Sequence, residues 1–425
     1  MEIKRDKYLQ MLQIRRNNGF VKVITGIRRC GKSYLMNDIF YNALIAEGVD
    51  ESHIVKFAFD SAEDLLLIGE NLQDLAKNKK KVDPQKFMTY VDKRVTDENM
   101  YYLLLDEVQN LDCFEAVLNG YLRKKNMDVY VTSSNSKFLS SDVLTEFAGR
   151  GDEVHVLPLS FSEFYANYKD GLDYAFDDYM IYGGLPAVAL MVTPEQKMSY
   201  LKTQLKNVYL KDIVDRHNLS SDEKLDELLD IIASGISSLT NPAKLSNTFK
   251  SVKNATLSEF TINNYITYMQ EAFMLSKANR YDVKGKKYIS TPYKIYFEDL
   301  GLRNARLDLR QIEETHLMEN IIYNELVRRG YSVDVGVVED RRNSAKKSKE
   351  IDFVVNSFDK KIYIQSALRM DDDYKQNAEL DSLRLTEDFF KKIVIRNDIP
   401  TSFFDEEGIY HVSFADFLLD KVQLF

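Results

Sequence analysis

Short apolar runs alternate with amphipathic stretches over roughly the first 165 residues, and this alternation is typical of a parallel sheet covered by helices. Three of the runs predict strands, at residues 21–25, 101–105 and 129–132. The run 101–105 is continuously apolar, which indicates a strand buried on both faces. Residues 33–43 predict a helix, because their apolar side chains share one face: Leu35, Met36, Ile39 and Phe40. We therefore expect an α/β domain over residues 1–165.

The pattern changes after this region. Residues 166–230 read as a helical lid or linker. Asn241-Pro242 predicts a helix start, with an N-cap followed by Pro, and a second helix is expected from about Leu257. Two strands follow, at 275–281 and 288–292, joined by a basic turn. Helix, turn, helix and basic hairpin is the order of a winged helix, which we place at residues 231–310. Residues 311–425 then form a further α/β domain.

The segment Gly26-Ile27-Arg28-Arg29-Cys30-Gly31-Lys32-Ser33 matches G-x-x-x-x-G-K-[ST] between the first strand and its helix. Unpaired backbone N–H groups and the positive end of the helix dipole converge there and favour phosphate. Lys32 can reach the β- and γ-phosphates, and Ser33 can ligate Mg²⁺. The expected cofactors are ATP and Mg²⁺. The expected nucleotide-binding residues are Gly26, Ile27, Arg28, Arg29, Cys30, Gly31, Lys32, Ser33 and Tyr34.

An acidic pair ends the apolar run 101–105. The carboxyl ends of parallel strands are where α/β sheets bind ligands. We expect Asp106 to hold the metal ion and Glu107 to polarise the attacking water as the catalytic base. An acidic helix cap is the structural alternative.

Two further polar positions are candidates for the γ-phosphate chemistry. Asn135, with Ser134 as the next choice, follows the strand 129–132 and could sense the phosphate through a water. Polar residues after a strand also simply make turns. Arg150 follows a short predicted helix, 142–147, and could act as an arginine finger on a neighbouring subunit's nucleotide. The alternative for Arg150 is an ordinary surface arginine.

These motifs resemble those of the AAA-type ATPases of bacteria and archaea that carry a C-terminal domain of unknown function. Three further segments share the resemblance: Pro158-Leu159-Ser160-Phe161, Tyr182-Gly183-Gly184-Leu185-Pro186 and Phe297-Glu298-Asp299-Leu300-Gly301-Leu302-Arg303. The resemblance covers nearly the whole chain. It implies an AAA+-like core, a winged helix and a nuclease-like C-terminal fold, but no biological role.

The C-terminal domain resembles the PD-(D/E)XK nuclease core, with Glu319 on a helix over 316–329 and Asp352 on a strand over 350–355. The next strand, 361–367, should supply Glu-x-Lys, and it carries Gln365 and Ala367 instead. Gln is an uncharged and poor Mg²⁺ ligand, and Ala cannot align water. We therefore predict a degenerate nuclease fold.

Composition and charge limit the partners and the cellular compartment that we expect. Apolar residues make up 44% of 425 residues, and the net charge is −9, which argues against a surface coated by nucleic acid. Residues 241–310 alone carry +6 and the remainder −15, so we expect DNA contact through the hairpin lysines Lys284, Lys286 and Lys287. No apolar stretch reaches 18 residues and no leader is evident, which predicts a cytoplasmic protein without membrane contact. The two cysteines fit that compartment.

The leading hypothesis is an ATP-hydrolysing AAA+-like homo-oligomer, with a hexamer as one candidate assembly, that acts on DNA through its winged helix. One alternative is a nucleotide-dependent regulatory or scaffold protein that binds protein partners without DNA. A third hypothesis is an ATP-dependent nuclease, which Gln365 and Ala367 oppose.

Overall fold

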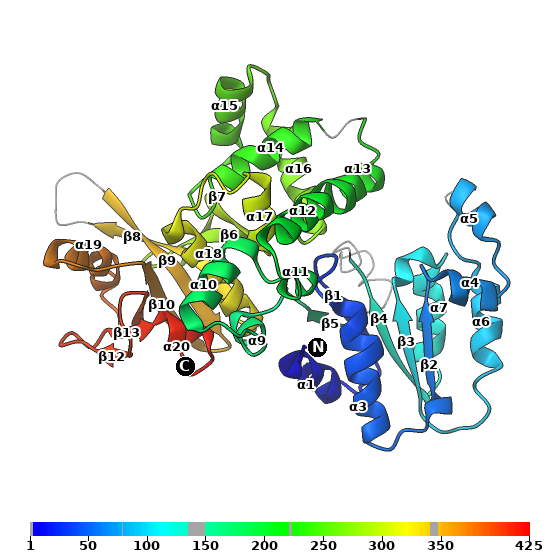
Figure 1. Cartoon of the computed structure of the whole chain (residues 1–425). Coiled ribbons are helices and arrows are strands. Elements are labelled where there is room, and N and C mark those ends of the chain that lie inside the picture. Colours follow the sequence, from blue (N-terminus) through cyan, green and yellow to red (C-terminus); the bar gives the residue numbers. More distant parts are fainter. Residues whose placement is uncertain (1–2, 79, 135–148, 221–222, 341–346) are drawn as a thin grey trace. The chain divides into compact units, whose positions relative to one another are not determined.

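A computed structural model of the chain describes residues 3–78, 80–134, 149–220, 223–340 and 347–425 (Figure 1). The chain divides into two units, one formed by residues 1–156 with 271–273 and the other by residues 157–270 with 274–425. The four-part division expected from the sequence stays a prediction. In the part of the chain that is described, no helix is both long and apolar enough to cross a bilayer.

The first unit contains a five-stranded sheet in the order β2-β3-β4-β1-β5, and every neighbouring pair is parallel. The three strands predicted from apolar runs are confirmed. The strands are β1 (Val21–Thr25), β2 (Ile54–Ala58), β3 (Tyr101–Asp106), β4 (Met127–Thr132) and β5 (Gly151–His155). All residues of β1, β3 and β4 are buried, and the continuous apolar run of β3 fits a sheet covered on both faces.

The helix predicted at 33–43 is present, but it begins at Lys32 and is not a uniform α-helix. It runs through α2 (Lys32–Tyr34), a π-helical segment (Leu35–Phe40) and α3 (Tyr41–Ala46). The other helices of the sheet domain are α1 (Asp6–Ile14), α4 (Ala62–Leu67), α5 (Leu72–Asn78), α6 (Pro84–Asp92) and α7 (Phe114–Leu122). Side chains from the strands and from α4, α6 and α7 form one apolar core. The predicted helix at 142–147 lies outside the described residues.

The second unit begins with helices. They are α9 (Phe161–Tyr165), α10 (Leu172–Tyr182), α11 (Pro186–Ala189), α12 (Pro194–Gln204), a π-helical segment (Leu205–Leu210), α13 (Lys211–His217), α14 (Glu223–Ser234), α15 (Pro242–Lys253), α16 (Glu259–Glu271) and α17 (Leu300–Arg306). The helix expected at Asn241-Pro242 is confirmed, since the Asn241 side chain accepts from Lys244 N.

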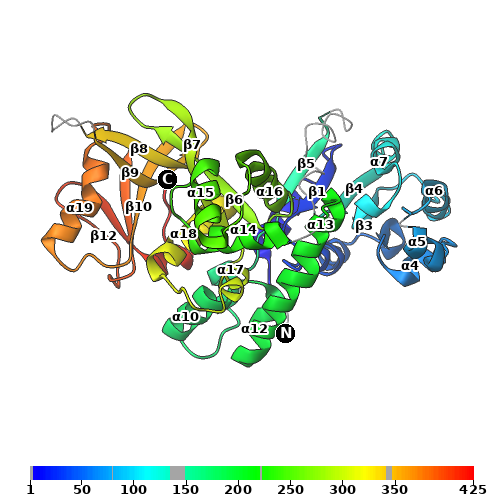
Figure 2. The same cartoon turned by 90° about the horizontal axis from the view of Figure 1, so that it is seen from above.

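An eight-stranded mixed sheet follows, in the order β12-β13-β11-β10-β9-β8-β6-β7. The strands are β6 (Leu275–Asp282), β7 (Lys287–Phe297), β8 (Ser332–Asp340), β9 (Lys347–Ser357), β10 (Lys360–Ala367), β11 (Lys391–Arg396), β12 (Phe403–Phe404) and β13 (Tyr410–Ser413). Helix α18 (Glu314–Arg328) packs on β7–β10, α19 (Asp373–Arg384) on β9 and β10, and α20 (Phe414–Leu418) on β11 and β13 (Figure 2).

The hairpin expected as a wing differs from the prediction in two ways. The second strand was expected to end at Pro292, yet β7 continues to Phe297. The β6–β7 pairing shifts register between Ala278 and Arg280, which pair with Lys294 and Ile289. Pro292 falls within this irregularity, where no regular ladder hydrogen bond is needed from it. The hairpin is also not free-standing, because β6 pairs with β8 of the C-terminal sheet through Arg280–Asp282.

Three motifs that are far apart in the sequence meet in the second unit. The Leu159 N–H donates to the Gly184 carbonyl at 2.7 Å, and the Gly184 N–H donates to Asp299 Oδ2 at 2.9 Å. A Cβ at Gly184 would lie 2.4 Å from the Leu159 carbonyl oxygen, and one at Gly301 2.0 Å from that of Tyr182. Such close backbone approach requires glycine at both positions. The motifs therefore have a structural role.

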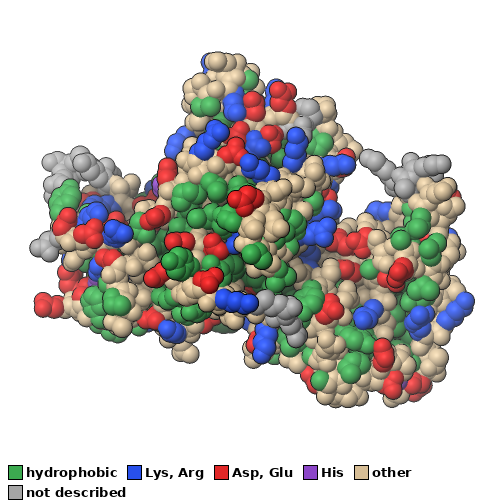
Figure 3. All heavy atoms as spheres, in the orientation of Figure 1, with side chains coloured by type: hydrophobic (Ala, Val, Ile, Leu, Met, Phe, Trp, Pro, Cys, Tyr) green, Lys and Arg blue, Asp and Glu red, His purple; other side chains and the backbone are tan. Residues whose placement is uncertain are grey.

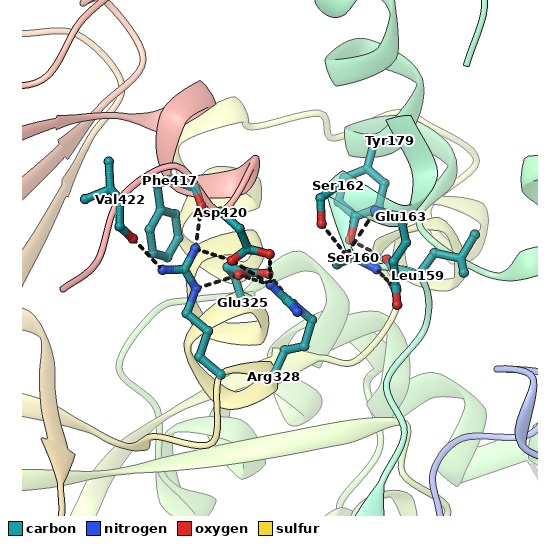
Figure 4. Close-up of polar contacts among 11 residues, drawn as sticks. Leu159, Ser160, Ser162, Glu163, Tyr179, Glu325, Arg328, Phe417, Asp420 and Val422 are labelled. Atoms are coloured by element: carbon teal, nitrogen blue, oxygen red, sulfur yellow. Dashed lines mark hydrogen bonds and ion pairs between the residues drawn. The ribbon is translucent and has the colours of Figure 1, made fainter. Parts of the chain in front are cut away.

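Figure 4 shows the polar contacts around this meeting point. Ser160 and Glu163 form a reciprocal capping box at the start of α9, and the Tyr179 hydroxyl donates to the Leu159 carbonyl at 2.8 Å. At the end of α18, Arg328 donates to Glu325 and to Asp420, its Nη2 lying 2.7 Å from Asp420 Oδ2. These charge-assisted bonds tie the chain's last segment to α18.

Asp299 should make stability depend on pH. Its carboxylate is buried, and burial raises its pKa to about 6 despite backbone donors such as the Gly184 and Leu302 N–H groups. Because the pKa is higher in the folded state, the stability that this carboxyl contributes is present at low pH and is lost as the pH rises to about 6. Relative to Asp299→Asn, we expect wild-type protein to lose about 3 kcal/mol of unfolding free energy between pH 3.5 and pH 7.

Urea unfolding of both proteins at matched pH values measures this difference. Parallel pH profiles for wild type and Asp299→Asn would show that the Asp299 carboxyl does not titrate in this way.

Candidate functional site

The loop between β1 and α2 is shaped by its two glycines. Gly26 has φ of 138°, and a Cβ there would lie 2.1 Å from the Val156 carbonyl oxygen. Gly31 is the N-cap of α2 and has φ of 102°, in the left-handed region. The loop therefore folds back on itself and presents its backbone at the start of the helix, where the helix dipole favours anions.

Some side chains of this loop are buried in the protein and others are exposed to solvent. Ile27 and Cys30 are buried, and Cys30 Sγ donates to the Val156 carbonyl oxygen at 3.2 Å. Lys32 is buried too, and its Nζ donates to the carbonyl oxygens of Gly26 at 2.9 Å and Ile27 at 3.1 Å. Its ammonium thus lies inside the curl of the loop. Arg29, Ser33 and Tyr34 are exposed, and Arg28 is partly exposed.

The acidic pair at the end of β3 faces this loop. Ser33 Oγ donates to Asp106 Oδ1 at 3.0 Å, and the Thr132 hydroxyl donates to the same oxygen. Thr132 ends β4, and the register of β3 with β4 pairs Leu105 with Val131, so Thr132 lies beside Asp106. A hydroxyl and a carboxylate therefore meet at the start of α2.

Glu107 adopts an unusual backbone conformation beside this pair. Its φ of 51° and ψ of 48° are left-handed, which is uncommon for a residue other than glycine. The Glu107 N–H donates to Thr132 Oγ1 at 2.9 Å, and its carboxylate accepts from Gln109 Nε2 and from Ser134 Oγ at 3.4 Å. These contacts hold the carboxylate at the carboxyl end of β3.

The electrostatics of this edge suit a proton acceptor. Burial raises the pKa of Glu107, and the positive charge of Lys32 opposes the shift. Asp60, just after β2, also has a raised pKa, first because of desolvation and then because of Asp106; Arg28 and Arg29 oppose it. Three acidic and three basic side chains therefore act on one another at one edge of the sheet.

The sequence analysis missed three residues here. Thr132 contacts both Asp106 and Glu107, Gln109 donates to the Glu107 carboxylate, and Asp60 adds a further charge. A signal existed for Thr132 and Asp60, because polar residues at or just after the ends of strands beside β3 must reach the same edge. Gln109 belongs to the motif Leu105-Asp106-Glu107-Val108-Gln109, but nothing in the sequence assigned it a role.

Other predicted site residues are placed differently. Asn135 lies outside the described residues. Arg150 immediately precedes β5, and its carbonyl accepts from Val21 N at 2.9 Å. Since β5 is parallel to β1 and Gly151 pairs with Val21, Arg150 lies at the opposite end of the strands from the loop that follows β1. It therefore stands away from its own chain's site.

Comparisons with known proteins agree with this geometry. Residues 18–165 match a model of an AAA domain, and residues 173–313 match a domain of unknown function (DUF8612). An uncharacterized protein of Haemophilus influenzae is 32% identical over 399 residues, which cover 92% of this chain and 93% of that protein. Uncharacterized protein MJ1544 of Methanocaldococcus jannaschii is 24% identical over 413 residues, 93% of this chain and 85% of its own.

Solved structures also show similarity. A Walker-type ATPase of Pyrococcus abyssi is 14% identical to this chain, with a TM-score of 0.48. The match covers 72% of this chain and 96% of the Pyrococcus abyssi chain. The Aeropyrum pernix Orc1 protein, solved in complex with DNA, is 11% identical with a TM-score of 0.32, covering 72% and 93%.

The parallel sheet, the phosphate-binding loop and the acidic pair define a P-loop ATPase of the AAA type. The chain belongs to the family of AAA-type ATPases with a C-terminal domain of unknown function, the family shared with the Haemophilus influenzae protein. The resemblance stated from the sequence motifs is thereby confirmed.

Proposed function

We propose that the protein hydrolyses ATP in a Mg²⁺-dependent reaction at the edge formed by the loop, β3 and β4. The observation that carries this proposal is the 3.0 Å contact between Ser33 and Asp106 beside Glu107, at the start of α2. In the proposed complex, backbone N–H groups of the loop bind the phosphates. The Lys32 ammonium exchanges its contacts with the Gly26 and Ile27 carbonyls for phosphate oxygens.

The residues present fit a magnesium ion. Mg²⁺ prefers oxygen ligands and is commonly bound by one or two protein groups together with substrate phosphates, and the Ser33 hydroxyl and the Asp106 carboxylate supply such groups. When bound, Mg²⁺ neutralises charge on the β- and γ-phosphates. Glu107 would take a proton from the attacking water, with Thr132 and Gln109 holding it in position.

The position of Arg150 decides how it could act as an arginine finger. Arg150 stands at the opposite end of the strands from its own loop, so a role as arginine finger requires a second copy of the chain. We propose that Arg150 acts in trans, on the nucleotide bound by a neighbouring copy of the chain. There its charge would stabilise the transition state of hydrolysis.

We further propose that ATP hydrolysis is coupled to DNA through the β6–β7 hairpin. Lys286 and Lys287 are exposed at the turn, whereas Lys284 Nζ lies 3.1 Å from Glu387 Oε2. Figure 3 shows basic side chains interspersed with acidic ones on the face that it presents, rather than one broad basic surface. A local contact is therefore the form of binding that the charge distribution favours.

Charge reversal at the hairpin tests the DNA proposal. We expect Lys286→Glu/Lys287→Glu to weaken DNA binding and to lower the slope of log affinity against log salt by about 1.8, the value for two phosphate contacts. Lys284→Glu should have a smaller effect, because Glu387 already pairs with that lysine. The measurement is fluorescence anisotropy with duplex and single-stranded DNA over a salt series.

The control is Lys375→Glu/Lys421→Glu, which reverses two exposed lysines outside residues 241–310. If both double variants bind DNA like wild type, DNA is not the ligand of the hairpin. The second candidate function, a nucleotide-dependent scaffold for protein partners, would then be favoured. Exposed apolar side chains such as Leu190 and Val192 support that alternative.

A further inference from the structure

A buried lysine that the sequence analysis did not single out lies at the centre of the nuclease-like domain. Lys294 is on β7, and its side chain is 3% exposed. Its Nζ lies 2.8 Å from Glu319 Oε1, 2.7 Å from Glu350 Oε1 and 3.2 Å from Asp352 Oδ1. One ammonium thus joins three carboxylates that come from α18 and from two positions on β9.

Two of these carboxylates, Glu319 and Asp352, are the positions at which the nuclease resemblance implies a divalent metal ion. The residues present do not fit one. A metal ion and the Lys294 ammonium would need the same oxygens, and two cations at that spacing repel each other strongly in a buried site. With Lys294 in place, no group of three or more His, Cys, Asp or Glu side chains among the described residues is arranged to hold a metal ion.

Two of these carboxylates also accept hydrogen bonds from other protein donors. The Tyr296 hydroxyl donates to Glu319 Oε1 at 2.6 Å, and the Ser366 N–H donates to Asp352 Oδ2 at 2.9 Å. Gln365, at the expected third-ligand position, donates to Glu379 Oε2 on α19 at 3.2 Å instead. Buried carboxylates that are paired and hydrogen-bonded in this way need no further cation.

Burial alone would lower the pKa of the Lys294 ammonium, but Asp352, Glu319 and Glu350 outweigh that effect and raise the pKa above the usual value for lysine. Burial also raises the pKa of Glu319, to about 8. The role of Lys294 therefore rests on its contacts with the three carboxylates and not on titration.

We propose that Lys294 is the built-in cation of this site. Its ammonium takes the place of the divalent metal ion of a nuclease. Through its ion pairs it links β7 to α18 and β9 without a metal ion. The C-terminal domain is then a metal-independent structural or binding module. This inference does not depend on the ATPase or DNA proposals, because it concerns residues outside both sites.

Replacing the ammonium by an apolar group of similar length tests the proposal. Lys294→Met leaves three carboxylates facing one another, and we expect it to melt several degrees below wild type in EDTA. It should also gain a response to Mn²⁺, with the melting temperature rising by about 5–10 °C at saturation. Wild-type full-length protein without nucleotide should melt at the same temperature in EDTA and in Mn²⁺.

Two controls assign the metal response to this site. Lys294→Met/Asp352→Asn removes one carboxylate and should lose the Mn²⁺ response. Lys277→Met removes a partly buried lysine on β6 that lies over the Tyr293 ring, and it should gain no Mn²⁺ response. A folded Lys294→Met protein that is indifferent to Mn²⁺ would overturn the proposal.

Wild-type protein gives an independent test if Lys294→Met does not fold. A Mn²⁺-induced stabilisation of wild type that disappears in Asp352→Asn would overturn the proposal. Nicking of supercoiled DNA in Mg²⁺ or Mn²⁺ that Asp352→Ala abolishes would overturn it as well. Equal melting in EDTA and Mn²⁺, with intact DNA, is the expected result.

Discussion

Glu107→Gln should lower the rate of ATP turnover by about 10²–10⁴-fold, the range for loss of a positioned general base. The amide keeps the size of the side chain but cannot accept the proton from the attacking water. Nucleotide affinity should stay close to that of wild type, because the phosphate-binding loop, Lys32 and Asp106 are unchanged. Phosphate release measured under single-turnover conditions separates the two quantities.

The matched control for this variant is Asp112→Asn, which neutralises an exposed carboxylate five residues farther along the chain. We expect it to turn over ATP like wild type. Full turnover by Glu107→Gln would remove Glu107 from the mechanism and would point to another acceptor, with Asp60 as a candidate at this edge.

Lys32→Ala should weaken ATP binding by about 10- to 100-fold, because it removes a charge-assisted contact to phosphate. The structure adds a consequence for the protein without nucleotide. Lys32 Nζ donates to the carbonyl oxygens of Gly26 and Ile27, so Lys32→Ala also removes two hydrogen bonds from the empty loop. Titration calorimetry with ATP, with and without Mg²⁺, measures the loss.

Lys80→Ala provides the comparison for the lysine variant, since Lys80 is exposed and is placed outside the site. It should bind ATP like wild type. Equal affinities for Lys32→Ala and wild type would mean that the ammonium does not reach the phosphates.

The core of the nucleotide site could be predicted because its signals are local. The glycine spacing around Lys32, the apolar run before Asp106 and the helix after Ser33 are each contained in a few neighbouring residues, and the topology of parallel sheets brings strand ends together. The parallel order of the sheet confirms that reasoning. The left-handed conformation of Glu107 could not be predicted, because nothing in the sequence marks it.

Contacts between distant segments were the hardest to predict. Lys294 lies 25 residues before Glu319 and 58 before Asp352, and its position in a strand gave no reason to connect it with either. The hairpin was expected as a basic wing, and its sequence contains no sign that β6 pairs with β8. The glycine at position 184 is likewise explained only by its contacts with the distant residues Leu159 and Asp299.

The most direct test of the central claim is phosphate release from ATP by the purified wild-type chain, in Mg²⁺ and in EDTA. Ser33, Asp106 and Glu107 converge at the start of α2, and this geometry predicts saturable hydrolysis in Mg²⁺ and loss of hydrolysis in EDTA. Tight ATP binding without any Mg²⁺-dependent phosphate release, from a sample shown to be folded, would contradict the assignment of this site as a hydrolytic one.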